Sequence, residues 1–159
     1  MSSLAVIWRA ADLLFATGVE SVVEVLAPLA WSPTPAVPPW VRGLFSHRGR
    51  FVPLVDAAVL LGAQRRPDRM ANRVLVVRCS SGPERIPWMT GLWVDCVVEL
   101  EKLDFAAPGV HPGFATAGGR FLGPVAQTRW GPVQLVEPEQ LFTAEQAAVL
   151  ADRLKEAAA

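Results

Sequence analysis

The sequence predicts an all-β protein with minor α content, built as small barrels or as a sandwich. Twelve glycines and fourteen prolines divide the 159 residues into many short apolar runs. Proline and glycine interrupt both helices and central strands, so runs this short favour strands. The clearest run, residues 91–100, places apolar side chains at every second position. That period of two is typical of a strand with one buried face.

The first expected elements are strands over residues 4–8 and 13–17, joined by a turn at residues 10–12. Residues 19–26 fit either a strand or a helical turn, and their β-branched content favours a strand. Proline-rich residues 28–39 and polar residues 64–72 are expected to be irregular, as are residues 106–119. The remaining expected strands are residues 50–55, 73–79, 91–100, 121–125 and 133–136.

Two helices are expected. Residues 56–61 form a short one, with Asp56 as its N-cap and Gly62 after its end. A longer amphipathic helix covers residues 143–156. It begins with Thr143 and Gln146 at the spacing of a capping box, in which each side chain satisfies a backbone N–H at the helix start.

The two halves of the chain echo each other. In the first half Gly43 is followed after thirteen positions by Asp56, and in the second Gly123 is followed after fourteen positions by Glu137. In both halves an apolar strand leads to the acidic residue and a helical turn follows. Chance similarity and two similar lobes both remain open at this point. Two such lobes would each be a small barrel, because closing a sheet removes its exposed edges.

Composition excludes several classes of protein. Apolar residues make up 52% of the chain and charged residues 19%, the net charge is zero and the mean hydropathy is +0.31. These values are typical of an ordered domain that leaves apolar surface for partners, and they disfavour nucleic acid as a partner. We expect a cytoplasmic protein with no signal peptide and no membrane insertion, since no apolar run approaches about 20 residues. Cys79 and Cys96 are expected to be small buried side chains in a reducing compartment.

Little in the sequence indicates catalysis. The only histidines are His47 and His111, so we expect no metal site, no cofactor and no catalytic residue. A small β-barrel enzyme stays an alternative, and it would require catalytic side chains that are distant in the sequence to converge in space. Among six tryptophans, Trp31 lies within the proline-rich segment and Trp40 directly follows it, and these two are the best candidates for exposure. Trp and Arg concentrate binding energy at protein interfaces, which favours a binding function.

Three blocks of the chain carry a family resemblance. Residues 37–56 read VPPWVRGLFSHRGRFVPLVD, residues 91–97 read GLWVDCV, and a closing block runs from Phe121 to Phe142. Together they resemble the signature of CheW-like chemotaxis coupling proteins, and the likeness extends over residues 4–154. The resemblance implies one domain of two packed five-stranded SH3-like barrels and a C-terminal helix. It places the boundary between lobes near residues 64–90 and leaves open whether the N-terminal strand joins the second lobe.

The same resemblance implies a function and its sites. The family couples chemoreceptor tips to the regulatory domain of a CheA-type histidine kinase and has no enzymatic activity. Arg48 matches the receptor-contacting arginine of the family's Asn-Leu-Arg-Gly turn, and Gly49, His47 and Trp40 complete the expected receptor-binding set. The expected kinase-binding residues are Val22, Glu24 and Val25. Alternation puts Val22 and Glu24 on one face, so Val25 is expected to point inward.

Some residues depart from the family pattern. Ser46 and His47 replace Asn-Leu, Pro124 replaces an expected glycine, and Trp130 stands in what is usually a polar turn. Residues 56–58 also lack the usual arginine. These departures indicate a divergent coupling protein. The alternative is a CheW-like binding module of a non-flagellar chemosensory pathway that acts on another partner.

Overall fold

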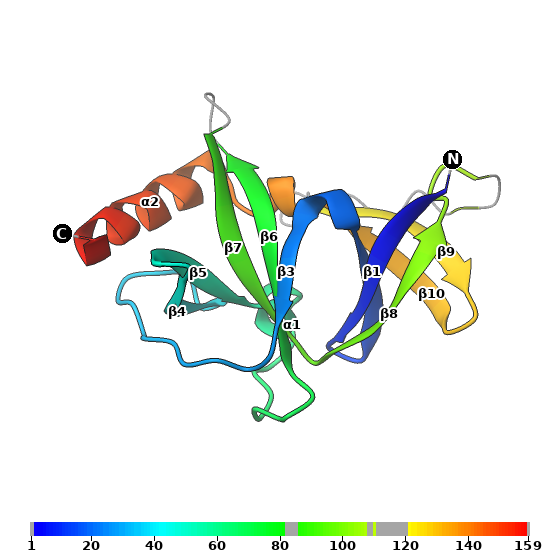
Figure 1. Cartoon of the computed structure of the whole chain (residues 1–159), viewed down its shortest axis with the longest axis horizontal. Coiled ribbons are helices and arrows are strands. Elements are labelled where there is room, and N and C mark those ends of the chain that lie inside the picture. The colour runs from blue at the N-terminus through cyan, green and yellow to red at the C-terminus, as the bar shows by residue number, and fades with distance from the viewer. Residues whose placement is uncertain (1, 82–85, 108–109, 111–120, 159) are drawn as a thin grey trace.

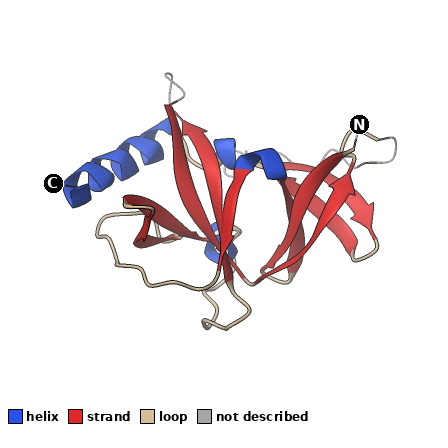
Figure 2. Cartoon of the chain, viewed as in Figure 1, coloured by secondary structure: helices blue, strands red, loops and turns tan. Residues whose placement is uncertain are grey.

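The computed structural model describes residues 2–81, 86–107, 110 and 121–158. Within these ranges the chain forms ten strands, two α-helices and two 3-10 turns (Figures 1 and 2). The helices are α1 (Ala57–Leu60) and α2 (Ala144–Ala158), and the turns are η1 (Val19–Ser21) and η2 (Pro138–Gln140). The strands are β1 (Ser3–Ala10), β2 (Leu13–Gly18), β3 (Val22–Leu26), β4 (Val41–His47), β5 (Arg50–Asp56), β6 (Arg73–Ser81), β7 (Ile86–Val94), β8 (Cys96–Leu103), β9 (Leu122–Thr128) and β10 (Gly131–Val136).

The strands form two five-stranded sheets with the same arrangement. The first sheet has the order β8-β1-β2-β10-β9 and the second has the order β3-β6-β7-β5-β4. Neighbouring strands are antiparallel except for the pairs β2/β10 and β5/β7, which are parallel. Each strand therefore has its counterpart five strands away along the chain. The predicted class, all-β with two five-stranded units and a C-terminal helix, is confirmed.

The internal echo of the sequence corresponds to this repeat. Gly43 lies in β4 and Gly123 in the equivalent strand β9. Asp56 ends β5 and Glu137 directly follows β10, and each precedes a single helical turn, α1 or η2. The similar spacing in the sequence thus marks the same hairpin and helical turn in each sheet.

The chain passes between the sheets at two places. It leaves the first sheet after Gly18, through η1, and returns at Asp95, whose N–H donates to the carbonyl of Arg9 at 2.9 Å. The expectation of one strand over residues 91–100 is therefore wrong, because β7 and β8 belong to different sheets. The apolar alternation continues through Asp95, so the pattern alone does not reveal that the chain changes sheet there. Leu100 is in fact 56% exposed, although the alternation had placed it on the buried face.

The start of β3 also differs from expectation. Residues 19–21 form η1, and the strand begins only at Val22. The crossing from β2 to β3 requires a turn, and this outweighs the β-branched content of the segment. The expected irregular segments at 28–39 and 64–72 contain no strand longer than one residue. The expected segment 106–119, with His111, lies largely outside the described residues.

One apolar core joins the two sheets. A single cluster contains Trp8 and Phe15 of the first sheet, Leu75 and Val94 of the second, and Leu150 of α2. Smaller clusters lie within each sheet, around Ile7 in the first and Leu54 in the second. Because burial of one large apolar side chain is worth about 1.5–3 kcal/mol, this shared core holds the barrels and α2 together as one unit.

Both helix starts follow the predicted pattern. The Asp56 side chain accepts a hydrogen bond from the Val59 N–H at 3.3 Å. At α2 the bonds are reciprocal: Gln146 N–H donates to Thr143 Oγ1 at 3.1 Å, and Thr143 N–H donates to Gln146 Oε1 at 3.0 Å. The predicted capping box is confirmed, and it fixes the point at which α2 turns toward the second sheet (Figure 1).

Candidate functional site

The hairpin turn between β4 and β5 has a geometry that few residues accept. His47 pairs with Arg50, which leaves Arg48 and Gly49 as the two turn residues. Both have positive φ, 52° and 78°, as a type I′ turn requires. Glycine adopts this region without penalty, whereas arginine does so at some cost. The tight turn projects Arg48 into solvent, where its side chain is 73% exposed.

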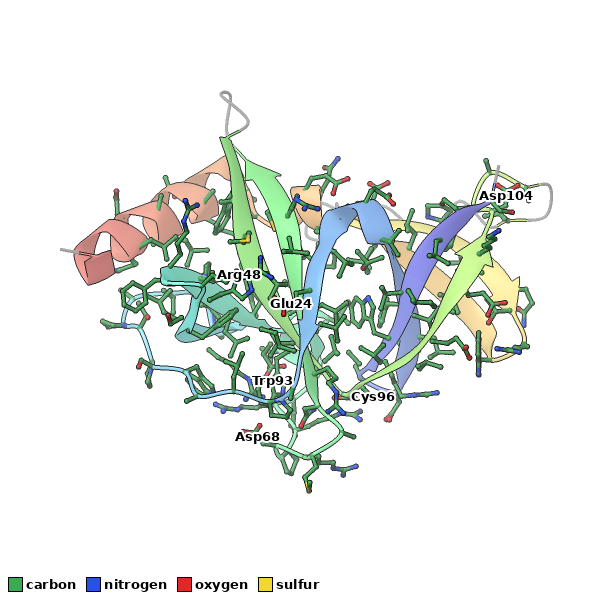
Figure 3. The ribbon with its side chains drawn as sticks, in the orientation of Figure 1. Glu24, Arg48, Asp68, Trp93, Cys96 and Asp104 are labelled. Carbon is green, nitrogen blue, oxygen red and sulfur yellow. The ribbon has the colours of Figure 1, made fainter. Side chains whose placement is uncertain are left out.

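Glu24 of β3 meets this turn. Its Oε2 lies 2.9 Å from His47 Nε2 and 3.3 Å from Arg48 Nη2. Figure 3 shows Glu24 and Arg48 close to one another. Because β3 and β4 are the two edges of that sheet, the contact closes the sheet into a barrel. We refer to Glu24, His47 and Arg48 together as the Glu24 clasp.

The clasp is electrostatically uneven. The hydrogen bond with His47 lowers the pKa of Glu24 below its usual value, with a smaller contribution from the charge of Arg48, while desolvation acts in the opposite direction. His47 is 6% exposed, and its distance to Glu24 fits Nε2–H donating to the carboxylate. Its buried Nδ1 has no hydrogen-bond partner among the described residues. The clasp thus consists of an exposed guanidinium and a buried imidazole on one carboxylate oxygen.

The expected kinase-binding residues differ in exposure along β3. Val22 is half-buried and packs against the shared core, whereas Val25 is 41% exposed. The expectation that Val25 points inward is therefore wrong. The pairing of β3 with β6 shifts register between Val22 and Glu24, and this irregularity breaks the simple alternation.

The expected receptor-binding residues do not all come together. His47, Arg48 and Gly49 share one turn, but Trp40 precedes β4 at its opposite end. At about 3.3 Å per residue that separation is on the order of 20 Å. Trp40 is half-buried, with its ring 5.2 Å from that of Phe142. Trp40 therefore packs against the shared core and does not lie at the turn.

A second clasp in the first sheet was not anticipated. Arg129, in the turn between β9 and β10, lies 3.0 Å from Glu99 and 3.7 Å from Glu101 of the edge strand β8. Its guanidinium also stacks on Trp130, 4.2 Å from the ring centroid. Trp130, which departs from the polar turn of the family pattern, packs against the core cluster of that sheet. The repeat could have predicted this ion pair. Arg129 occupies the position in the first barrel that Arg48 occupies in the second, and β8, which carries Glu99, is the equivalent of β3.

A buried ion pair was also missed. Arg42 is 8% exposed, lies 2.9 Å from Asp56 and stacks on Trp93 at 4.4 Å. A further contact at 3.0 Å to Asp68 ties the loop before β6 to β4. Trp31, expected to be exposed, is half-buried, with Arg42 and Arg65 over its ring. These contacts are structural, because a buried arginine that lost its carboxylate would be left uncompensated.

Cys79 lacks the features of a reactive thiol. Cys79 is 2% exposed, and burial raises the pKa of its thiol to about 12, so it stays protonated. Cys96 is half-buried rather than buried as expected, because it begins β8 at the crossing between the sheets. Among the described residues no group of three or more His, Cys, Asp or Glu side chains could hold a metal ion. Nor does any described helix have the length and apolar character to cross a bilayer.

Two curated proteins are similar to this chain in sequence. Protein PilI of Pseudomonas aeruginosa is 33% identical over 94 residues, which are 59% of this chain and 49% of that protein. Chemotaxis protein CheW of Helicobacter pylori is 28% identical over 92 residues, 58% of this chain and 52% of that protein. The matches thus span about half the length of these curated relatives.

The fold has a counterpart among solved structures. The crystal structure of the scaffolding protein TtCheW from Thermoanaerobacter tengcongensis superposes with a TM-score of 0.74 and 22% identity, over 89% of this chain and 93% of that one. This likeness concerns the fold. The model of the CheW-like domain family matches residues 5–146, nearly all of the two barrels. The chain therefore belongs to the CheW-like domain family.

Proposed function

We propose that the chain is a non-enzymatic adaptor that couples chemoreceptor signalling tips to the regulatory domain of a CheA-type histidine kinase. The observation that carries the proposal is the Glu24 clasp. It joins the strand expected to meet the kinase to the turn expected to meet the receptor, so the two surfaces are continuous. Membership in the CheW-like family and the relative named chemotaxis protein CheW support this assignment.

On the receptor side the active group is the Arg48 guanidinium. It is mostly exposed and makes one described contact, to Glu24. A guanidinium carries five N–H donors, so most of them remain available for a carboxylate or amide oxygen of a partner. The type I′ turn holds the side chain on a fixed base, which reduces the entropy lost when it binds.

On the kinase side the surface is the edge strand β3. Glu24 is about one third exposed, and the neighbouring Val25 offers an exposed apolar side chain. An acidic group beside an apolar one suits a partner surface that carries a cation next to an apolar pocket. Since Glu24 also binds Arg48, a partner at either surface acts on the same carboxylate.

The proposal is tested by measuring both affinities for charge-reversed variants. Titrations use a purified receptor hairpin and the regulatory domain of a CheA-type kinase. Arg48→Glu should weaken the receptor affinity tenfold or more. It should also change the kinase affinity, by a smaller factor, because it places a second carboxylate beside Glu24. Glu24→Lys should weaken kinase binding most.

Arg129→Glu provides the matched control. It reverses the equivalent turn residue of the first barrel and should leave both affinities unchanged. If wild-type protein binds neither partner, the adaptor function is wrong. Equal losses for Arg48→Glu and Arg129→Glu would instead mean that the site lies elsewhere.

A second candidate function is a CheW-like binding module of another, non-flagellar chemosensory pathway. The specific observation in its favour is the 33% identity to a protein named PilI rather than CheW. The replacement of the family's leucine by His47 at the clasp agrees with an altered partner. Binding of the chain to a receptor hairpin without binding to the kinase domain would favour this second function.

A further inference from the structure

A groove opens in the second barrel where two parallel strands separate. β5 and β7 are paired through Leu54–Gly91, Val55–Leu92 and Asp56–Trp93, and their N-terminal halves are not paired with each other. Between these halves lies a groove of about 340 Å³ that α2 borders through Leu154. It differs from the Glu24 clasp, since none of the three clasp residues lines it.

The groove has an apolar floor and an apolar rim. Trp88 and Met89 of β7 line it, and the Trp88 ring is supported by Phe142 at 4.8 Å. Phe51 of β5 also lines the groove and leaves 46% of its surface exposed, and Leu154 of α2 is a further apolar lining residue. A large aromatic side chain left open beside a firmly supported aromatic floor is the arrangement found at binding hot spots.

The charges around the groove have one sign. Arg50 of β5 and Arg78 of β6 both line it, and these strands are the two neighbours of β7 in the sheet. Arg78 is held in place because its Nη1 donates to the carbonyl of Glu20 at 2.9 Å, and its other N–H groups remain donors. No lining side chain among the described residues is acidic. Since the chain as a whole has zero net charge, this positive surplus is local.

We propose that this groove docks an amphipathic helix of a partner protein. The apolar ridge of that helix enters between Phe51 and Leu154, and acidic side chains on its two flanks pair with Arg50 and Arg78. A strand fits less well, because the separated halves of β5 and β7 contain Pro53 and Pro87. Proline lacks the N–H that strand addition needs, whereas a helix binds through its side chains at positions i and i+4.

The test uses the intact chain and two stapled helical peptides as probes. The peptides share one leucine ridge, and one carries glutamates on its flanks where the other carries lysines. In a titration followed by amide NMR, the glutamate peptide should shift the signals of Arg50, Phe51, Arg78 and Met89. It should bind at least tenfold more tightly than the lysine peptide. Raising the salt concentration should reduce that ratio, because exposed charges are screened.

Two variants and two controls locate the binding. Phe51→Glu and Arg50→Glu change exposed side chains, so folding should be preserved, and each should weaken the glutamate peptide fivefold or more. The controls Leu13→Glu and Arg69→Glu likewise replace an exposed apolar side chain and an exposed arginine by glutamate, but outside the groove, in the first barrel and in the loop before β6. These controls should leave the peptide affinity as it is.

Three results would overturn the inference. They are equal affinity for the two peptides, shifts that map away from the groove, and equal losses in variants and controls. If the groove signals instead move with the concentration of the chain alone, the occupant is a second copy and the partner helix is wrong. Neither receptor nor kinase is used, so failure here leaves the proposed function standing, and failure of receptor binding leaves this inference standing.

Discussion

The β4–β5 and β9–β10 turns occupy equivalent places in the two barrels but are supported differently. Each presents an arginine, Arg48 or Arg129, that reaches a glutamate on the opposite edge strand. In the second barrel a buried histidine shares the glutamate, whereas in the first barrel a tryptophan lies under the arginine. The repeat has kept the ion pair that joins the edges and changed the group beside it.

The two turns also differ in the kind of interaction that holds them in place. Trp130 packs against its core cluster, so the first-barrel turn is held largely by apolar contact. The turn of the second barrel depends on a hydrogen bond to an ionisable carboxylate and on a strained φ at Arg48. A side chain held in an uncommon backbone conformation by its surroundings is a feature of functional sites. The β4–β5 turn therefore combines a positive φ with an ionisable support, which agrees with the proposed receptor contact at Arg48.

The largest expected effect tests whether the two barrels fold as one. Val94 is completely buried in the shared core, and Val94→Asp would place an unpaired charge there. We expect the whole chain to unfold, with loss of NMR dispersion for Ile7 in the first barrel as well as Leu54 in the second. Val25→Asp, at an exposed position of the same barrel, should stay folded. Persistent native signals from the first barrel would show that the barrels are independent.

Equivalent glycines provide the next test. Gly43 has a φ of 156°, and a Cβ there would lie 1.9 Å from the carbonyl oxygen of Ser32, which bonds to the Leu44 N–H. Gly43→Ala should therefore cost about 2–3 kcal/mol of unfolding free energy in urea denaturation. At Gly123 the nearest atom is Leu135 Cβ at 3.3 Å, and Gly123→Ala should cost at most about 1 kcal/mol. Equal costs would mean that the segment over Gly43 moves aside freely.

These glycines also show what the sequence could predict. The spacing from Gly43 to Asp56 and from Gly123 to Glu137 indicated two similar lobes, and the caps at Asp56 and Thr143 were recognisable because they depend on neighbours within a few residues. The crossing at Asp95 was not predictable from the apolar pattern. Apolar residues recur at every second position through residues 91–100, whereas the change of sheet is set by long-range pairing.

For the site, the family resemblance singled out Arg48 and Gly49, because the motif that carries it is continuous in the sequence. The meeting of Glu24 with His47 joins residues 23 positions apart and follows from the closure of the barrel. Arg42 and Asp56, 14 positions apart, were missed for the same reason. Trp40 was grouped with Arg48 because they are close in the sequence, but a whole strand separates them.

A smaller effect concerns pH. The pKa of Glu24 is lower in the folded protein than its ordinary value of 4.5, so its ionised form stabilises the fold. That contribution is complete above pH 4.5 and is lost as the pH falls through the lower folded-state pKa. Wild type should therefore have a higher free energy of unfolding than Glu24→Gln at neutral pH. The difference between the two free energies should disappear in acid, as measured by urea unfolding across this range. A difference that stays constant would show that the charge of Glu24 does not stabilise the clasp.

The smallest expected effect on stability separates the turn from its guanidinium. Arg48→Asn keeps a residue that accepts positive φ and creates the Asn-Gly pair preferred in type I′ turns, while it removes an exposed ion pair. The two changes oppose each other, so the free energy of unfolding should shift by less than about 0.5 kcal/mol. Receptor-hairpin affinity should nevertheless fall tenfold or more in the same titration. Arg129→Asn makes the equivalent change at a turn residue without positive φ and should leave that affinity intact. Unchanged receptor binding by Arg48→Asn would assign the β4–β5 turn to barrel closure alone.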